Sequence, residues 1–249
     1  MIRRPPRSTP KPSSAASDVY KRQAVNNINF SLNERNTIGL LGPNGCGKTT
    51  TIAMLLGLIT PTSGSIKIDN QNLNPKDHQF LSKMNFASPY VELPKKLTVM
   101  QNLKVYAMMY EIKNPTKKIE ELIENLKLQD FIYKKTGELS SGQRNRISLA
   151  KSLINDPQIL LLDEPTASLD PDTGDFIRSF IEEYQKNNPI SILLASHNMN
   201  EVNRLCDHIL MMKEGKIIDQ GNAEYLISKH GRNNLEEVFL KIAREKNEN

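Results

Sequence analysis

Short apolar runs alternate along the chain with stretches of helical spacing, and this alternation predicts a sheet flanked by helices. Three of the runs are almost wholly apolar and are bounded by polar or turn-forming residues. We expect each to form a buried strand: Ile38–Leu41, Ile159–Asp163 and Ser191–Ser196. The predicted fold class is therefore α/β.

Other elements follow from weaker patterns. Alternation predicts a half-buried strand over Ala24–Leu32, whose apolar face would carry Ile28, Phe30 and Leu32. Further strands are expected at Ser65–Asp69 and Met84–Ser88, and a hairpin at Ile209–Ile218 with its turn at Lys213–Gly215. Helices are expected at Thr49–Leu58, Gln143–Ile154 and Leu235–Arg244, and a helical block from Leu97 to about Lys135.

A glycine-rich stretch joins the first buried strand to the helix after it. It reads Gly42-Pro43-Asn44-Gly45-Cys46-Gly47-Lys48-Thr49-Thr50, which fits the phosphate-loop pattern G-x-x-x-x-G-K-[ST]. Glycines let the backbone N–H groups curl towards one centre, and the helix adds its positive end. Lys48 would reach the β- and γ-phosphates, and the Thr49 hydroxyl would hold Mg²⁺. A turn that binds nothing is disfavoured by the strand and helix on either side.

Two acids stand at the carboxyl end of the strand Ile159–Asp163, where α/β sheets bind ligands. Asp163 would bind Mg²⁺, directly or through water. Glu164 would polarise a water molecule for in-line attack on the γ-phosphate. An acidic turn after a buried strand is common, so the pair indicates a nucleotide site only in combination with the phosphate loop.

The segment Leu139-Ser140-Ser141-Gly142-Gln143 opens a predicted helix. A Ser- and Gly-rich turn in this place can present N–H groups and a hydroxyl to an anion. An ordinary helix N-cap would have the same amino-acid sequence, so these residues alone leave both interpretations open. Farther along, Ala167-Ser168-Leu169-Asp170 follows the acidic pair, and His197 directly follows a buried strand.

In this order, the segments resemble the ATP-binding cassette (ABC) family from Ala24 to about Asp219. The segment at Leu139 resembles the family's signature peptide Leu-Ser-Gly-Gly-Gln, Ala167–Asp170 resembles its D-loop, and His197 resembles its switch histidine. The resemblance implies that two copies of the chain, bound head to tail, hydrolyse ATP with Mg²⁺. Each ATP would lie between Gly42–Thr50 of one copy and Ser140, Ser141, Gly142 and Gln143 of the other.

The resemblance also implies roles for single residues. Lys48 would bind phosphate, Thr49 and Asp163 would hold Mg²⁺, and Glu164 would position the attacking water. His197 would contact the γ-phosphate, and Asp170 would couple the two sites across the dimer. Such a site is incomplete in a monomer.

The implied architecture is a P-loop NTPase (RecA-like) core sheet flanked by helices, with an antiparallel β part and an inserted helical subdomain. We expect the ATPase domain to span 24–228. Its core would comprise 24–88 and 151–228, and its helical subdomain about 89–150. A C-terminal helix would follow within 229–249.

Two positions depart from the family's pattern. The family has a Gln that touches Mg²⁺ and couples to the membrane partner, but gapless alignment places Pro89 there. Ser88 is the nearest available ligand, and Pro89-Tyr90-Val91 is the expected coupling surface. The adenine-stacking aromatic normally lies just before the first strand, where Tyr20 is the candidate, so the residue that stacks on the base is unassigned.

Charge and composition narrow the class of protein. Residues 1–23 contain six of the 33 Lys and Arg residues and one acid, which leaves 27 basic and 27 acidic residues in 24–249. The body is formally neutral, so no direct nucleic-acid partner is expected. The Pro-, Ser- and Arg-rich segment 1–23 is either a foreign leader, since it resembles translated sequencing-library sequence, or a native disordered arm. The cysteines, Cys46 and Cys206, form no disulfide framework, which suits a reducing cytoplasm.

Two classes of function fit the resemblance. The first is the ATPase subunit of an ABC transporter, peripheral on the inner face of the cell membrane. Its transmembrane permease would be a separate chain, because no apolar run here approaches the roughly 18 residues that span a bilayer. The segment Leu235–Leu240 resembles the tail of cassettes paired with ABC-2-type exporters of drugs, polysaccharides or lipids, although a plain amphipathic helix is the alternative. The transported substrate is not encoded in this chain.

The second class is a soluble ABC ATPase that acts on ribosomes or nucleic acid. Ribosome-acting members usually carry two cassettes in one chain, and only one fits here. Chromosome-type members insert a long coiled coil, whereas Lys48 and Ser140 lie 92 positions apart without sustained heptads.

Overall fold

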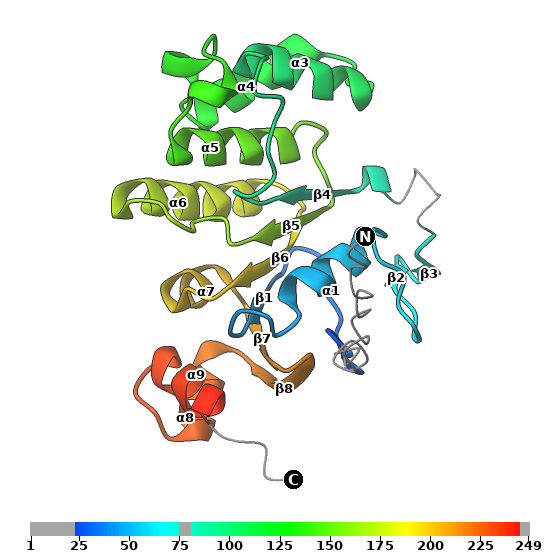
Figure 1. Ribbon diagram of the computed structural model, residues 1–249, viewed down its shortest axis with the longest axis vertical. Helices are drawn as coiled ribbons and strands as arrows, with labels where there is room; N and C mark the ends of the chain where they lie inside the picture. The colour runs from blue at the N-terminus through cyan, green and yellow to red at the C-terminus, as the bar shows by residue number, and fades with distance from the viewer. Residues whose placement is uncertain (1–22, 75–80, 245–249) are drawn as a thin grey trace, which may run out of the picture.

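The computed structural model describes residues 23–74 and 81–244, which are arranged around a six-stranded sheet with helices on both faces (Figure 1). Neighbouring strands from β4 to β7 run parallel, and β8 lies antiparallel beside β7. The sheet contains, in spatial order, β4 (Met84–Ala87), β5 (Ile159–Asp163), β6 (Ser191–Ser196), β1 (Thr37–Leu41), β7 (His208–Lys213) and β8 (Lys216–Gly221). The α/β class predicted from the apolar runs is confirmed.

The three most apolar runs form the centre of this sheet. All residues of β1 and β6, and all but the first of β5, are buried, because helices cover both faces. β6 lies between the other two, and the register pairs Asp163 with Ala195 and Leu41 with Ser196. The carboxyl ends of the three strands therefore meet at one edge of the sheet.

The helices form two layers. α1 packs on one face of the sheet, whereas α5, α6 and α7 pack on the other, where α3 and α4 extend the layer (Figure 1). The helices are α1 (Lys48–Leu55), α3 (Val99–Met109), α4 (Pro115–Asn125), α5 (Ser141–Ser152), α6 (Pro171–Asn187), α7 (Met199–Leu205), α8 (Ala223–His230) and α9 (Leu235–Arg244), with 3₁₀ turns η2 (Gln129–Phe131) and η3 (Thr136–Glu138). None of the helices in the described ranges has the length and apolarity that crossing a membrane requires.

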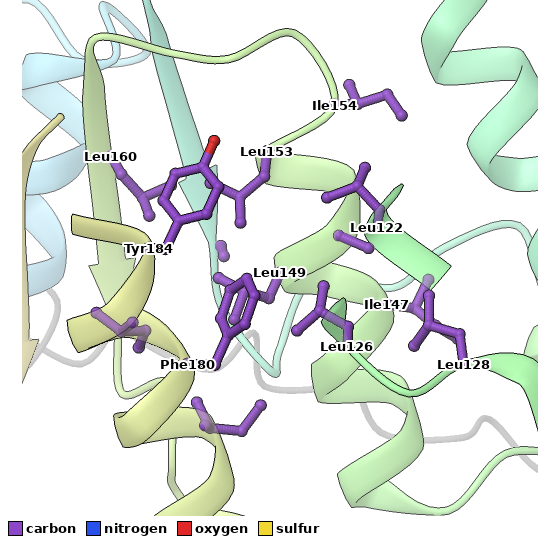
Figure 2. Packing of buried hydrophobic residues seen from close by; sticks show 14 of the residues in the cluster. Leu122, Leu126, Leu128, Ile147, Leu149, Leu153, Ile154, Leu160, Phe180 and Tyr184 are labelled. Carbon is purple, nitrogen blue, oxygen red and sulfur yellow. The ribbon is translucent and has the colours of Figure 1, made fainter. Parts of the chain in front are cut away.

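The largest buried cluster joins the helical block to the sheet. Figure 2 shows side chains of α4 and α5 packed against Leu160 of β5 and against Phe180 and Tyr184 of α6. Phe180 and Tyr184 themselves stack as a tilted pair with ring centroids 5.8 Å apart. The block predicted from Leu97 to about Lys135 is helical, as expected. The boundary near residue 89 between core and helical subdomain stays a prediction.

Leu122 offers a test of this cluster, because its side chain on α4 is fully buried. Replacement by Ala leaves a cavity and is expected to lower the free energy of unfolding by about 2–5 kcal/mol. Leu58→Ala is the matched control, since Leu58 is 75% exposed and its loss should change stability by less than about 0.5 kcal/mol. Urea denaturation measures both values. Equal effects of the two variants would contradict the packing described here.

The strand predicted over Ala24–Leu32 is wrong, because residues 24–36 contain no strand. The predicted apolar side of the segment nevertheless faces the core. Ile28, Phe30 and Leu32 are half buried against the cluster beneath α1. The segment's backbone is attached to the turn between β7 and β8, where the Asn26 N–H donates to the Gly215 carbonyl over 2.7 Å. The alternation reflects packing on the core, without pairing to a neighbouring strand.

Other differences concern element length and three unpredicted helices. The strand expected at Ser65–Asp69 is reduced to β2 (Lys67–Ile68), and it pairs with β3 (Gln71–Asn72), which no prediction covers. No prediction covers α6, α7 or α8. In α6 the signal is present, because Ile177, Phe180, Ile181 and Tyr184 follow helical spacing and are buried.

Candidate functional site

The phosphate loop runs from the end of β1 to the start of α1. Gly45 and Gly47 have φ values of 78° and 110°, which other residues rarely adopt. A Cβ atom on Gly47 would also lie 2.5 Å from the Ala24 carbonyl oxygen, so no larger residue fits there. α1 has no side-chain cap and no acid in its first turn. Its first N–H groups are therefore available to an anion.

Lys48 is only 6% exposed although it carries a charge. Its Nζ donates to the Gly42 carbonyl over 2.6 Å and to the Pro43 carbonyl over 3.4 Å. Both partners are neutral, so the positive charge stays available to a bound phosphate. Of the other loop residues, Cys46 is buried, Pro43 and Thr50 are half buried, and Asn44 and Gly45 are exposed.

Thr49 and Asp163 come together although they lie 114 positions apart. The Thr49 hydroxyl donates to Oδ2 of Asp163 over 3.0 Å. Burial raises the pKa of the Asp163 carboxyl, and the bond from Thr49 opposes this rise.

Both groups present oxygen atoms, which Mg²⁺ prefers. Within 23–74 and 81–244, no cluster of three or more His, Cys, Asp or Glu side chains could hold a metal by itself. Mg²⁺ usually takes one or two protein ligands together with substrate phosphates and water, so this pair fits it.

Glu164 and His197 also meet at this edge. Nδ1 of His197 lies 2.7 Å from Oε2 of Glu164, and the side chains are 57% and 12% exposed respectively. A carboxylate can only accept, so Nδ1 donates in this contact. Within the described part of the chain, Nε2 has no hydrogen-bond partner. Glu164 has a left-handed φ of 54°, and its N–H donates to the Ala195 carbonyl of β6 over 2.8 Å. This bond fixes the start of the loop after β5 against the neighbouring strand.

The predicted signature segment forms the start of α5. Ser140 caps the helix, since its Oγ accepts from the Gln143 N–H over 3.2 Å, and Gln143 Oε1 accepts from the Ser140 N–H over 3.1 Å. Ser140 and Ser141 are exposed, and Gly142 and Gln143 are half buried. The structure thus shows the helix cap. The second role, presentation to an anion, stays a prediction, and α5 lies on the opposite face of the sheet from α1 (Figure 1).

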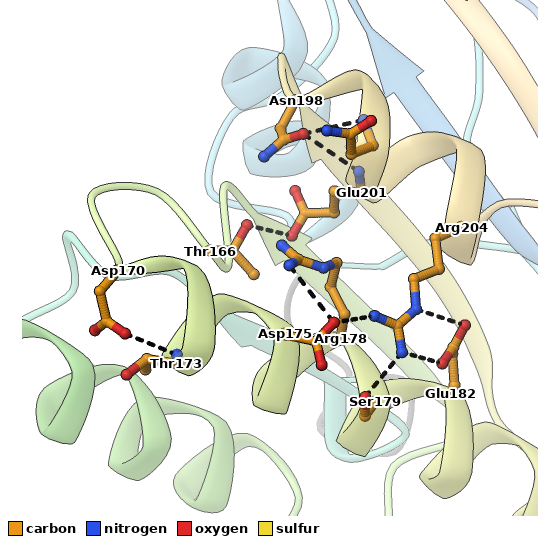
Figure 3. A network of polar contacts seen from close by, with 11 residues as sticks. Thr166, Asp170, Thr173, Asp175, Arg178, Ser179, Glu182, Asn198, Glu201 and Arg204 are labelled. Atoms are coloured by element: carbon orange, nitrogen blue, oxygen red, sulfur yellow. Dashed lines mark hydrogen bonds and ion pairs between the residues drawn. The ribbon is translucent and has the colours of Figure 1, made fainter.

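Asp170 caps the start of α6 in the same manner. Its Oδ1 accepts from the Thr173 N–H over 2.9 Å, and this bond lowers the pKa of Asp170 (Figure 3). The starts of α5 and α6 adjoin, because a Cβ atom on Gly142 would lie 3.0 Å from the Thr173 side chain. The segments predicted to face a second copy are therefore neighbours in this one.

The two departures from the family's pattern have different outcomes. Ser88 is 3% exposed, its Oγ accepts from the Tyr90 N–H over 3.3 Å, and its carbonyl accepts from Ser148 over 3.2 Å. Its role as a metal ligand stays a prediction. Tyr90 and Val91 are exposed, as a coupling surface requires. Tyr20, the candidate for adenine stacking, lies outside the described residues, as does most of segment 1–23.

One buried acid near the site was not anticipated. Glu201 of α7 is 1% exposed and accepts a hydroxyl hydrogen bond from Thr166 (Figure 3). It accepts a second one from Ser196. Thr166 follows Glu164 by two residues, and Ser196 precedes His197. Sequence spacing places Glu201 beside the apolar Val202, but it does not distinguish a buried acid from an exposed one.

Comparisons with known proteins agree with this geometry. The family model described as ABC transporter matches residues 25–167. The Nod factor export ATP-binding protein I of Burkholderia orbicola is 35% identical over 209 residues, or 82% of this chain and 67% of that protein. The bacitracin transport ATP-binding protein BcrA of Bacillus licheniformis is 35% identical over 218 residues, or 86% of this chain and 70% of that protein.

Two solved structures share the fold. The cbiO1 protein of Clostridium perfringens, part of the ABC transporter complex cbiONQ, is 29% identical with a TM-score of 0.74, covering 83% of this chain and 85% of that chain. The ATP-binding cassette MJ0796, in a dimeric post-hydrolysis state bound to ADP and Pi, is 26% identical with a TM-score of 0.73. That match covers 80% of this chain and 90% of the other.

Proposed function

We propose that this chain, which belongs to the ABC transporter family, binds ATP with Mg²⁺ where the carboxyl ends of β1, β5 and β6 meet. Hydrolysis of the ATP would drive export through a separate membrane permease. The chain is an ATP-binding subunit of the family's ATPases. The observation that carries the proposal is the convergence of three strand ends. Lys48, the Thr49–Asp163 pair and the Glu164–His197 pair follow β1, β5 and β6, which are adjacent in the sheet.

Each group has a separate task in this proposal. The phosphate loop and Lys48 bind the phosphates through N–H groups and a buried charge. Thr49 and Asp163 would hold Mg²⁺, which would neutralise charge on the phosphates. The Glu164 carboxylate accepts a proton from the attacking water. His197 would donate from Nε2 to the γ-phosphate when both of its ring nitrogens carry a proton, because Nδ1 already donates to Glu164.

The site would be completed by a second copy bound head to tail. Ser140–Gln143 and Asp170 lie at adjoining helix starts, at which N–H groups and caps suit an anion. The MJ0796 cassette forms a dimer, which supports this assembly. A formally neutral body over 24–249 supports the proposal that nucleic acid is not a direct partner.

Export is the direction that the relatives favour, because one exports Nod factors and another transports bacitracin. The ABC-2-type resemblance of Leu235–Leu240 agrees with these names. In the structure, α9 also serves as a packing helix, since Leu235, Val238 and Ile242 are buried against α7 and α8. No relative described here is a ribosomal or DNA-acting ATPase, so the second class loses support.

The permease would dock on the side of the molecule that holds the helical block. Tyr90 follows β4 and is 71% exposed, and Met108, Met109 and Tyr133 of the block are also exposed. The cbiO1 relative is part of a complex with the other components of cbiONQ, which supports a partner for this chain too. Docking of this kind would place the chain on the inner face of the membrane.

Phosphate release by the purified full chain tests the proposal. We expect hydrolysis that requires Mg²⁺ and stops with EDTA, because the phosphates and the Thr49–Asp163 pair need a cation between them. Specific activity should also rise with protein concentration, since two copies complete each site. Hydrolysis at equal rate with EDTA would contradict the metal role. Specific activity independent of concentration, in a monomeric sample, would contradict the shared site.

A further inference from the structure

Glu201 is a buried acid that the proposed hydrolysis leaves without a task. It lies on α7 with 1% exposure, and each of its carboxylate oxygens contacts a different hydroxyl. Oε1 accepts from Thr166 over 2.9 Å (Figure 3). Oε2 accepts from Ser196 over 2.5 Å. Burial raises the pKa of Glu201, and the two hydroxyl bonds oppose this rise. A carboxyl group in such a place is costly unless it is well bonded, so its position needs a reason.

The two hydroxyls lie beside Glu164 and His197 in the chain, Thr166 in the loop after β5 and Ser196 at the end of β6. Thr166 lies in the turn after β5, which is closed by a bond from the Ala167 N–H to the Glu164 carbonyl over 3.0 Å. Ser196 ends β6, and its Oγ also accepts from the Asn198 N–H over 3.0 Å on the far side of His197. Glu201 therefore bridges the backbone segments whose side chains meet 2.7 Å apart in the Glu164–His197 pair.

We propose that Glu201 is a positioning residue for ATP hydrolysis, holding Glu164 and His197 in their relative places through Thr166 and Ser196. This inference rests on the proposed function. Misplacement of a catalytic group by about 1 Å can lower the rate about 100-fold. Glu164 also has a left-handed backbone, a conformation that neighbouring bonds must maintain. The hydrogen bond from Thr166 to Glu201 is one such bond, because Thr166 lies two residues after Glu164.

A purely structural role for Glu201 would have a different signature. The same helix carries a second polar bridge, in which Arg204 contacts Asp175 (2.5 Å) and Glu182 (2.8 Å) of α6 (Figure 3). Arg204 fastens α7 to α6 without contact to either loop of the site. Loss of Arg204 thus perturbs the packing of α7 and leaves the position of Glu164 unchanged. It is the matched control.

The experiment compares the full-length variants Glu201→Ala, Glu201→Gln, Thr166→Val and Arg204→Ala. For each, phosphate release gives kcat and KM, equilibrium binding gives the Kd for ATP, and circular dichroism gives the Tm. Glu201→Ala is expected to lower kcat about 100-fold while Kd changes less than about threefold. Glu201→Gln should keep at least about a third of the wild-type kcat, because an amide can accept from one hydroxyl and donate to the other. Thr166→Val should lower kcat about tenfold, and Arg204→Ala should lower only the Tm.

Three results would overturn the inference: a Glu201→Ala kcat within twofold of wild type, an equal loss of kcat in Arg204→Ala, or a Glu201→Gln variant as slow as Glu201→Ala. If Glu201→Ala does not fold, Thr166→Val decides, and an unchanged kcat in that variant would refute the bridge. A wild-type chain without hydrolysis would instead contradict the proposed function, so the two failures are distinguishable.

Discussion

Replacing Glu164 with Gln is expected to lower the rate of ATP hydrolysis at least about 100-fold, which is the usual scale for loss of a general base. The amide has the size of the carboxylate, and its oxygen can still accept from Nδ1 of His197. In the wild-type chain, Nδ1 lies 2.7 Å from Oε2 of Glu164. It cannot take a proton from water. ATP binding depends on the phosphate loop, so the Kd for ATP should stay within about threefold of wild type. Phosphate release and equilibrium binding measure the two quantities.

The matched control for this change is Glu182→Gln. Glu182 lies on α6 and pairs with Arg204, away from the strand ends that form the site. We expect its hydrolysis rate to equal that of wild type. Hydrolysis at the wild-type rate by Glu164→Gln would show that another group activates the water.

Replacing Lys48 with Ala is expected to weaken ATP binding about 100-fold, which corresponds to about 2.7 kcal/mol. The Lys48 ammonium is buried, and its partners in this structure are two neutral carbonyls of the loop. Phosphate oxygens would be stronger, charged partners. Without the ammonium, part of the negative charge on ATP would be buried at the start of α1 without a cation from the loop. Titration with a fluorescent ATP analogue measures the Kd.

Lys83→Ala serves as the control, because Lys83 is a partly exposed lysine whose Nζ pairs with Asp69 over 2.8 Å. Its loss removes one positive charge from the chain without touching the loop. An equal loss of affinity in both variants would mean that net charge, and not the position of Lys48, governs binding. Glu164→Gln and Lys48→Ala together separate the chemical step from binding.

The sequence predicted the centre of the fold better than its periphery. β1, β5 and β6 are buried on both faces, and residues with that environment are apolar at nearly every position, so the runs are easy to read. The segment Ala24–Leu32 has the alternation of a strand because one side contacts the core. Alternation of apolar and polar residues indicates which side of a segment is buried. It does not indicate whether the backbone hydrogen-bonds to a neighbouring strand.

The same distinction applies to the site. The phosphate loop, Asp163 and His197 were predicted as separate segments, because each lies at or directly after the end of a buried strand. Their contacts depend on β6 lying between β5 and β1, which no single segment encodes. Glu201 was missed because its bonding partners come from two other loops. The adenine-stacking residue is still unassigned, since the candidate Tyr20 lies outside the described residues.

The position of β6 has a consequence for the order in which this protein is made. The ribosome completes the phosphate loop and the acidic pair before it adds Ser191–Ser196, yet β1 and β5 pair with β6 and not with each other. A nascent chain that has not yet released β6 from the ribosomal tunnel holds both motifs without a strand to join them. High-affinity ATP binding should therefore begin only after Ser191–Ser196 has emerged from the tunnel. Until then, nucleotide cannot stabilise the growing chain against proteolysis.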